Sequence, residues 1–257
     1  MRRKVLVMMT AVMFVVSSYA AVSVTKNLAG TVTIAVDGEA GQIGKEITNQ
    51  SGNTTYDYAS GILEADTLIK NAGALVITGN INSTDIKALV QNNQSDNIWT
   101  LNTLDMGGAT IDSIKVKTND SGDITSHDFL PQSYMKIDCM SLTLPVASDG
   151  ILPDYFGFCL TNELTSVTFP DGYTYLGDNA FTGKSKLKSV KLPGSLESIG
   201  KEAFQRTALE EITFPNTLKS IDDNAFEECL GLKTVSFPAD FEKLGNNVFF
   251  NVPQIRN

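Results

Sequence analysis

The chain carries few side chains that could catalyse a reaction. His127 is its only histidine, so a Ser-His-Asp or Cys-His catalytic site would have to include it. It lies in the polar stretch of residues 112–129, which predicts a projecting loop and not a cleft. No glycine-rich phosphate loop is present, and no pair of carboxylates stands out for glycoside hydrolysis, although any two acids could converge after folding. We therefore predict a non-enzymatic protein with no catalytic residue and no cofactor, and keep a glycan-active enzyme as a further alternative.

Metal binding has equally little support. A zinc site of the usual kind needs more His and Cys at suitable spacing than one histidine and three cysteines provide. Four neighbouring side chains could present oxygen atoms to calcium: Asn119, Asp120, Ser121 and Asp123. The twelve-residue calcium-loop pattern with its terminal Glu is absent there, so a plain polar loop is the preferred interpretation. We predict no metal site.

A repeated segment positions most of the remaining side chains. The heptapeptide LTSVTFP at residues 164–170 returns, with variations, at residues 187–193, 209–215 and 232–238, and in a worn form at 139–145. The four clear copies start 23, 22 and 23 residues apart. A period in this range is typical of a solenoid, in which each unit is too small to bury its own apolar face and stacks on its neighbours.

Offsets within a unit, counted from its first residue as zero, predict which side chains are buried. Alternation along a strand sends offsets 3 and 5 inward, and the apolar residue at offset 12 and the phenylalanine at offset 17 complete the core. In the worn unit, Ile151 falls at offset 12 and Phe156 at offset 17. Asp222 and Asp223 replace the Gly-Asp, Gly-Lys or Gly-Asn of other units, which indicates helix capping. The predicted inward residues are Val167, Val190, Ile212 and Val235; Phe169, Leu192, Phe214 and Phe237; Leu176, Ile199, Ile221 and Leu244; and Phe181, Phe204, Phe226 and Phe249.

The outward offsets 2 and 4 form the sheet face that solenoids commonly use for binding. This face carries small hydroxyls with one lysine and one glutamate, and it lacks the Trp, Tyr and Arg that usually anchor tight interfaces. A solvated surface without a partner is therefore the alternative to a weak contact with an extended partner. The candidate binding residues are Ser166, Thr168, Ser189, Lys191, Glu211, Thr213, Thr234 and Ser236, preceded by Ser141 and Thr143 in the worn unit.

The three cysteines fit a core better than they fit a reactive site. Cys159 and Cys229 both lie at offset 20, where Val252 occupies the equivalent position. A position that accepts Cys or Val is a small buried apolar site. Cys139 replaces the first leucine of its unit. We predict three buried thiols, with a Cys139–Cys159 disulfide as the alternative.

The N-terminus predicts export. Residues 2–4 are basic, residues 5–16 are apolar, and Ser18-Tyr19-Ala20 supplies small residues for cleavage after Ala20. An uncleaved anchor is the alternative. No cysteine for lipid attachment follows the apolar stretch, and no later segment is long and apolar enough to span a membrane. The expected location is secreted, periplasmic or on the cell surface.

Charge narrows the range of partners. The chain has 20 basic and 29 acidic residues, a net charge of −9. Cleavage after Ala20 removes Arg2, Arg3 and Lys4, which leaves 17 basic against 29 acidic residues and a net charge of −12. A surface this acidic repels nucleic acid and anionic lipid, so neither is expected as a partner.

The spelling of the units, Leu-x-x-Val-x-Phe-Pro followed by Leu/Ile-Gly-x-x-Ala-Phe-x-x-Cys, resembles the BspA-like leucine-rich repeats of bacterial surface and secreted proteins over residues 139–254. Residues 74–111 resemble the N-terminal repeats of such proteins from gut and oral Bacteroidetes. The resemblance implies an α/β repeat fold: a right-handed leucine-rich repeat solenoid with a parallel β-sheet on its concave face, short helical or irregular returns and an N-terminal cap. It also implies export and adhesin-like binding to host or bacterial surface components. Asp66-Thr67 and Asp112-Ser113 resemble the O-glycosylation sites of exported Bacteroidetes proteins.

Five segments are expected along the chain. They are a signal peptide (1–20), an N-terminal cap (21–72), first leucine-rich repeats (73–111), an inserted loop with a degenerate repeat (112–138) and BspA-like repeats (139–257). Inside the cap, the pattern predicts one or two strands at 22–36, a loop at 38–53 and a helix at 59–69. Residues 83–90 predict a short helix with Ser or Thr as its N-cap.

The leading functional expectation is a secreted or surface-exposed protein that binds a protein or glycan through the sheet face or through residues 112–129. The alternative is a structural module that self-associates. Its last unit, around Phe249, Phe250 and Ile255, would then form an open coil that pairs two copies into a homodimer.

Overall fold

The computed structural model describes residues 22–27, 30–36, 44–48, 54–58, 72–82, 85, 101–111, 116–118, 124–127 and 138–255. The predicted signal peptide, the predicted helix at 59–69 and both predicted glycosylation motifs lie outside these residues. So does most of 83–90, and the division of the chain into five segments stays a prediction.

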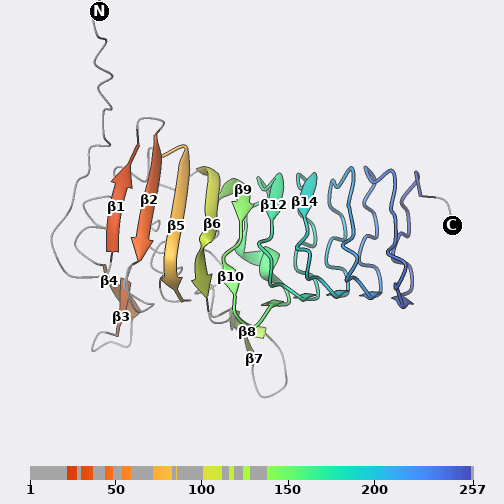
Figure 1. The fold of residues 1–257 in the computed structure, drawn as a ribbon, viewed down its shortest axis with the longest axis horizontal. Helices are drawn as coiled ribbons and strands as arrows, with labels where there is room; N and C mark the ends of the chain where they lie inside the picture. The colour runs from red at the N-terminus through yellow and green to blue at the C-terminus, as the bar shows by residue number, and fades with distance from the viewer. Residues whose placement is uncertain are drawn as a thin grey trace, which may run out of the picture.

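One long sheet, here called the main sheet, runs along the molecule in chain order (Figure 1). All neighbouring strands are parallel except β1 and β2. Parallel neighbours require the chain to return to the same end after each strand, so this order defines the coils of a solenoid. The one or two strands predicted within 22–36 are confirmed as two, and two further strands lie in the segment expected to hold the first repeats. The main sheet contains β1 (Val22–Lys26), β2 (Thr31–Val36), β5 (Ala74–Ile81), β6 (Leu101–Ile111), β9 (Cys139–Thr143), β12 (Ser166–Thr168) and β14 (Ser189–Lys191), with β10 (Val146–Ala147) paired to the end of β6.

The predicted alternation of buried and outward side chains holds along the main sheet. Val167 and Val190 are buried, whereas Ser189 and Lys191 on either side of Val190 are exposed. The last unit departs from the expected core, because Phe237 is 38% exposed and Leu244 is 51% exposed. No further coil among the described residues covers these two side chains.

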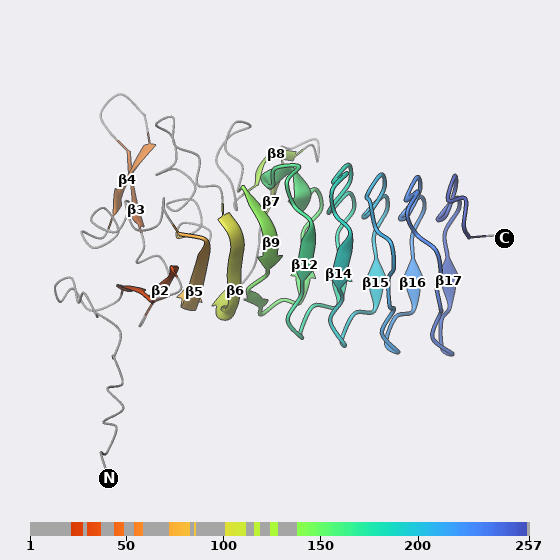
Figure 2. The ribbon, with the colours of Figure 1, turned by 90° about the horizontal axis from the view of Figure 1, so that it is seen from above.

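A second parallel sheet forms where the sequence indicated only single apolar residues. It contains β11 (Ile151–Leu152), β13 (Tyr175–Leu176), β15 (Ser198–Ile199), β16 (Ser220–Ile221) and β17 (Lys243–Leu244). Each strand is two residues long, which is too short for an alternating pattern to reveal. Figure 2 shows β15, β16 and β17 in line along a nearly straight row of coils.

The assignment of Ile151 to the core is wrong by one residue. Leu152 pairs with Leu176 and is fully buried, whereas Ile151 is 41% exposed. The worn unit is 25 residues long against 22 or 23 in the others, and one of its additional residues precedes the second strand, so the inward phase shifts by one. Phe156 is buried as expected, at the start of the 3-10 helix η1 (Phe156–Cys159), where it contacts Phe181 edge-on.

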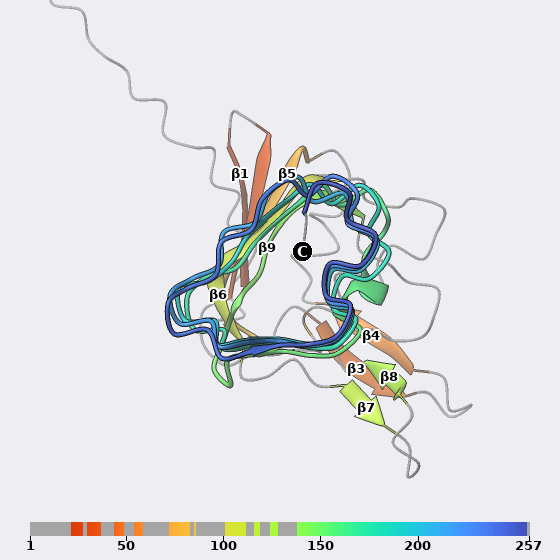
Figure 3. The same cartoon turned by 90° about the vertical axis from the view of Figure 1, so that its right-hand side faces the viewer.

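The return segments are turns and not the expected short helices, since η1 is the only helix within residues 138–255. Asn179, Glu202, Asn224 and Asn247, one per coil, adopt a left-handed conformation with φ between 54° and 57°. Such residues interrupt a right-handed helix. Instead, each return donates backbone hydrogen bonds to the next one: Phe181 N to Ala203 O at 2.7 Å, Phe204 N to Ala225 O at 2.8 Å and Phe226 N to Val248 O at 2.9 Å. We call this arrangement the return ladder, and Figure 3 shows the superposed coils end-on.

The phenylalanines of the returns stack as predicted. Ring centroids lie 5.5 Å apart for Phe181 and Phe204, 5.3 Å for Phe204 and Phe226, and 5.6 Å for Phe226 and Phe249. The first three rings are fully buried. They form one side of a continuous apolar core beneath both sheets.

Two antiparallel hairpins project from the same side of the stack (Figures 1 and 3). β3 (Gly44–Thr48) pairs with β4 (Thr54–Tyr58), so the loop predicted for 38–53 is wrong in part. The Thr- and Tyr-rich β4 is a favourable partner for a strand whose own composition is neutral. β7 (Val116–Thr118) pairs with β8 (Ile124–His127), so the predicted projecting loop contains a short hairpin.

Asn82 and Asp85, which follow β5, are joined by two hydrogen bonds. Its side chain accepts a hydrogen bond from the Asp85 backbone at 3.2 Å, and Asp85 Oδ2 accepts one from the Asn82 backbone at 2.9 Å. This reciprocal pair is a capping box with an amide as N-cap. The predicted helix at 83–90 with its Ser or Thr N-cap lies outside the described residues apart from Asp85 and stays a prediction.

Candidate functional site

All eight predicted binding residues lie on the outer face of the main-sheet wall, and strand register places four of them side by side. Ser166 lies beside Ser189, and Thr168 beside Lys191, in adjacent parallel strands. Ser166 and Thr168 are half-buried, whereas the other six are exposed: Ser189, Lys191, Glu211, Thr213, Thr234 and Ser236. Exposure of this face therefore rises toward the last three units.

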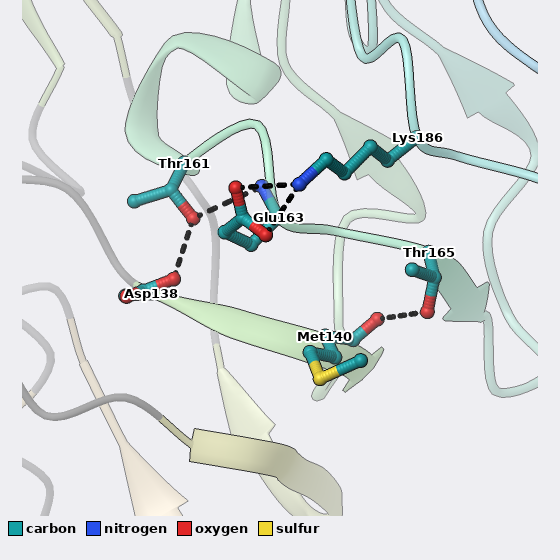
Figure 4. Close-up of polar contacts among 6 residues, drawn as sticks. All are labelled: Asp138, Met140, Thr161, Glu163, Thr165 and Lys186. Atoms are coloured by element: carbon teal, nitrogen blue, oxygen red, sulfur yellow. Dashed lines mark hydrogen bonds and ion pairs between the residues drawn. The ribbon is translucent and has the colours of Figure 1, made fainter.

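In the first two units, polar groups of this face are already paired within the chain (Figure 4). Thr165 Oγ1 donates to the carbonyl oxygen of Met140 at 2.8 Å, and Thr161 Oγ1 donates to Asp138 at 2.8 Å. Lys186 bonds to the Glu163 carboxylate at 2.7 Å. The hydroxyl of Ser166 lies 3.0 Å from that of Ser141. These pairings leave fewer groups for a partner.

The backbone pairing of the main sheet ends at β14. In earlier coils, Leu144 N donates to Thr168 O and Phe169 N donates to Lys191 O, both at 3.0 Å. Among the described residues, no equivalent bond leaves Leu192 or Phe214. The second sheet and the return ladder continue through the same coils. The coils therefore stay stacked while one wall loses part of its hydrogen bonding.

A groove of about 360 Å³ lies across this part of the main-sheet wall. We call it the charged groove. Lys188 and Glu210 form an exposed ion pair of 3.1 Å within it. The groove brings together three predicted residues and three that the sequence analysis missed, all from the last three units. Its lining is Lys188, Ser189, Glu210, Glu211, Lys233 and Thr234.

The three missed residues share one place in the repeat. Lys188, Glu210 and Lys233 stand at offset 1, next to the first leucine of each unit. Alternation was applied from offset 2 onward, so these side chains were assigned to neither face. Strict alternation extended by one position would have placed offset 1 inward, whereas all three side chains are exposed, so the pattern could not predict them.

The described cysteines are inert core residues. Burial raises the pKa of the Cys139 thiol to about 12, and the neighbouring Asp138 carboxylate adds to the rise. Burial also raises the pKa of Cys229. A protonated thiol is a poor nucleophile. Cys139 is free, so the alternative disulfide with Cys159 is not formed, and the side chain of Cys159 lies outside the described residues.

Carboxylates near the second sheet bind groups of the neighbouring coil. Burial raises the pKa of Asp154, and the nearby Asp178 charge adds to the rise. Asp223 Oδ1 accepts the Asn246 backbone N–H of the next coil at 2.7 Å, and Asp222 binds Lys243 at 2.6 Å. The predicted helix-capping role of Asp222 and Asp223 is thus wrong, because both join neighbouring coils.

Neither a metal cluster nor a membrane span is found in the described part of the chain. No group of three or more His, Cys, Asp and Glu side chains there could hold a metal ion. Residues 119–123 lie outside that part, and His127 is placed in β8 by its backbone alone. None of the helices described is long and apolar enough to cross a membrane.

Stacked coils, a parallel sheet in chain order and a ladder of returns define a leucine-rich repeat solenoid. Residues 133–257 match the BspA type leucine rich repeat region in 6 copies, one more than the five units counted from the sequence. This part of the chain therefore carries repeats of the BspA type. Proteins of this type are typically non-enzymatic and located at the cell surface or secreted.

Several solved bacterial structures are similar. A T. pallidum leucine rich repeat protein is 27% identical with a TM-score of 0.42, over 45% of this chain and 56% of that chain. A leucine rich cell surface protein from Faecalibacterium prausnitzii A2-165 is 19% identical with a TM-score of 0.34, over 88% and 55%. A leucine-rich repeat protein from Bacteroides ovatus ATCC 8483 is 15% identical with a TM-score of 0.31, over 93% of both chains. The chain thus spans little more than half the length of the first two, and a comparison with curated proteins gave no match.

Proposed function

We propose that this protein is an exported, adhesin-like binding protein that contacts a host or bacterial protein or glycan through the outer face of its main sheet. The observation that carries the proposal is the charged groove in the last three units. Its exposed lysines, glutamates and hydroxyls differ from the internally paired hydroxyls of the first two units.

The composition of the groove favours a polar, extended partner. Exposed charges in high dielectric contribute little individually, and no aromatic side chain lines the groove to anchor a tight contact. A partner that spans several coils would add such weak contacts together. Repeated copies on a surface would strengthen attachment further through multivalency.

The test is a binding screen against extracellular-matrix proteins and glycans, followed by variants. Lys191→Ala combined with Glu211→Ala should weaken binding of any partner found. The matched control, Asp222→Ala with Lys243→Ala, removes one acid and one lysine beside the second sheet and should leave binding unchanged. Deletion of the β7–β8 hairpin tests the other surface. Unchanged affinity in the double variant and in the deletion would exclude both surfaces.

A second candidate function is structural, and the edge of the last described coil favours it. Phe250 is 58% exposed, Leu244 is 51% exposed and Phe237 is 38% exposed, while the residues that match Leu244 in the inner coils, Leu176, Ile199 and Ile221, are fully buried. An exposed apolar edge of this kind can pair with another chain. If it does, Leu244→Ser with Phe250→Ser should abolish a concentration-dependent homodimer in light scattering.

A further inference from the structure

Two rows of alternating charge run along the last three units, on two different walls. The first, here called the groove row, is Lys188, Glu210 and Lys233 at offset 1. The second, here called the wall row, is Glu197, Lys219 and Glu242 at offset 10, directly before the second-sheet strands β15, β16 and β17. The groove row reads plus, minus, plus, and the wall row reads minus, plus, minus.

The two rows have the same spacing, because each carries one charge per coil and neighbouring members are joined through their backbones. In the groove row, Glu210 N donates to Lys188 O, and Lys233 N donates to Glu210 O, both at 3.3 Å. In the wall row, Lys219 N donates to Glu197 O, and Glu242 N to Lys219 O, both at 2.8 Å. Strands joined this way lie about 4.8 Å apart. The charges of one row can therefore meet those of the other one to one.

All six side chains are available to a partner. Each one is exposed. No ion pair among the described residues involves Glu197, Lys219 or Glu242. The Lys188–Glu210 pair lies at the surface, with 63% and 50% of the side chains exposed, so its members can turn toward a second molecule.

We propose that the groove row of one molecule binds the wall row of a second copy. Opposite charges then face each other in all three coils. The order reads the same from either end, so the two solenoids can lie parallel or antiparallel. Because each molecule carries both rows on separate walls, the contact is heterologous and continues into open rows or closes into rings.

The overall charge of −9 opposes association at long range but not at contact. At physiological ionic strength the Debye length is about 8 Å, so repulsion between whole molecules is damped while touching pairs keep most of their attraction. Association should accordingly be measurable at physiological salt and weaker when salt is removed. This self-assembly goes beyond the proposed binding of an external partner and does not depend on it.

The test exchanges the charges of each row and measures size by sedimentation velocity over a range of protein concentrations. The groove inversion is Lys188→Glu, Glu210→Lys and Lys233→Glu. The wall inversion is Glu197→Lys, Lys219→Glu and Glu242→Lys. Each inversion keeps opposite charges in adjacent coils, so it preserves the favourable order within its own row. The double inversion leaves the net charge unchanged.

The wild-type protein should form assemblies that grow with concentration, and each single inversion should sediment as a monomer. Assembly should return in the double inversion and in a mixture of the two single inversions. Leu244→Ser with Phe250→Ser should assemble like the wild type, which separates this contact from the apolar edge. A monomeric wild-type protein, an unaffected single inversion or a double inversion without recovery each overturns the proposal, and none of these results bears on the matrix-protein and glycan screen.

Discussion

The main-sheet wall and the second-sheet wall of the solenoid differ in how they are hydrogen-bonded over the last units. On the main-sheet wall, strand pairing ends at β14, and the coils from 209 onward keep only bonds at their first positions. On the other wall, the second sheet continues to β17 and the return ladder reaches residue 250. The second sheet and the return ladder, here called the continuous wall, hold the stack together through the last units. The main-sheet wall of the same units, here called the open wall, exposes charges.

Close approach between coils strengthens the continuous wall. Asp178 Oδ1 accepts the Lys201 backbone N–H of the next coil at 2.7 Å. Two units further along, Asp223 Oδ1 accepts the Asn246 backbone N–H in the same way. Gly177 lies so near the preceding coil that an added Cβ would lie 2.3 Å from Asp154 N. Neighbouring coils of this wall pack closely because the aspartates accept hydrogen bonds between them and Gly177 has no side chain.

The largest effect is expected in the phenylalanine stack of the continuous wall. Phe204→Ala removes a fully buried ring between Phe181 and Phe226 and should lower the free energy of unfolding by about 3–5 kcal/mol. Phe237→Ala on the open wall should cost much less, because Phe237 is 38% exposed. Urea unfolding of both variants measures the difference. Equal losses would show that the two walls contribute alike.

The next largest loss of stability is expected when a side chain is added between the coils of the continuous wall. Gly177→Ala would bring a Cβ to 2.3 Å from Asp154 N and 2.4 Å from the carbonyl carbon of Pro153, and backbone atoms cannot move aside cheaply. We expect a loss of about 1–3 kcal/mol. Gly194→Ala is the control, since its new Cβ would meet only Asp171 Oδ1 at 3.5 Å. Thermal unfolding of the two variants should separate them clearly.

Amide hydrogen exchange compares the walls without any substitution. Within the described residues, the N–H groups of Leu192 and Phe214 have no backbone acceptor on the open wall. Gly200 N donates to Leu176 O at 2.8 Å and Asp222 N to Ile199 O at 2.9 Å in the same coils. The first pair should exchange much faster than the second in NMR. Equal protection of all four would mean that the open wall is hydrogen-bonded in solution.

The smallest effect concerns a carboxylate of the continuous wall. The pKa of Asp154 is raised, so its charged form costs stability above that pKa, and the cost disappears as the pH falls below the ordinary value of 3.8. Asp154→Asn keeps an oxygen for the Asp178 N–H, which now lies 2.7 Å from Asp154 Oδ1. The variant should be slightly more stable at pH 7 and indistinguishable in strong acid. Destabilisation at pH 7 would mean that the negative charge is favourable in the fold.

Sequence periodicity was sufficient for the main-sheet strands as far as Lys191, for the inward columns of the inner coils and for the stacked phenylalanines, whereas the copies at 209–215 and 232–238 form no strand. Each of these depends on residue type at a fixed offset, and the offsets are visible in the chain. Val167, Val190 and Phe204 accordingly lie where they were predicted. The position of Ile151 failed because one extra residue shifted the phase within a single unit.

The second sheet, the turn-like returns and the groove depend on relations between coils. Two-residue strands become strands only when the neighbouring coil pairs with them. Asn224 belongs to a residue type that tolerates the left-handed conformation, whereas the same conformation at Glu202 has no marker in the residue type. The end of main-sheet pairing after Lys191 has no marker in a repeat that continues unchanged.

The peptide dipoles of the return ladder all point the same way along the solenoid. In an ordinary sheet, peptide dipoles alternate and nearly cancel. Here Phe181, Phe204 and Phe226 all point their N–H groups toward the later coil, and Ala203 and Ala225 point their carbonyls back toward the earlier one. The dipoles of these peptide groups therefore add along the stack, as they do along an α-helix. The returns of the last coil therefore lie at the positive end of this one array, and each additional repeat would lengthen it.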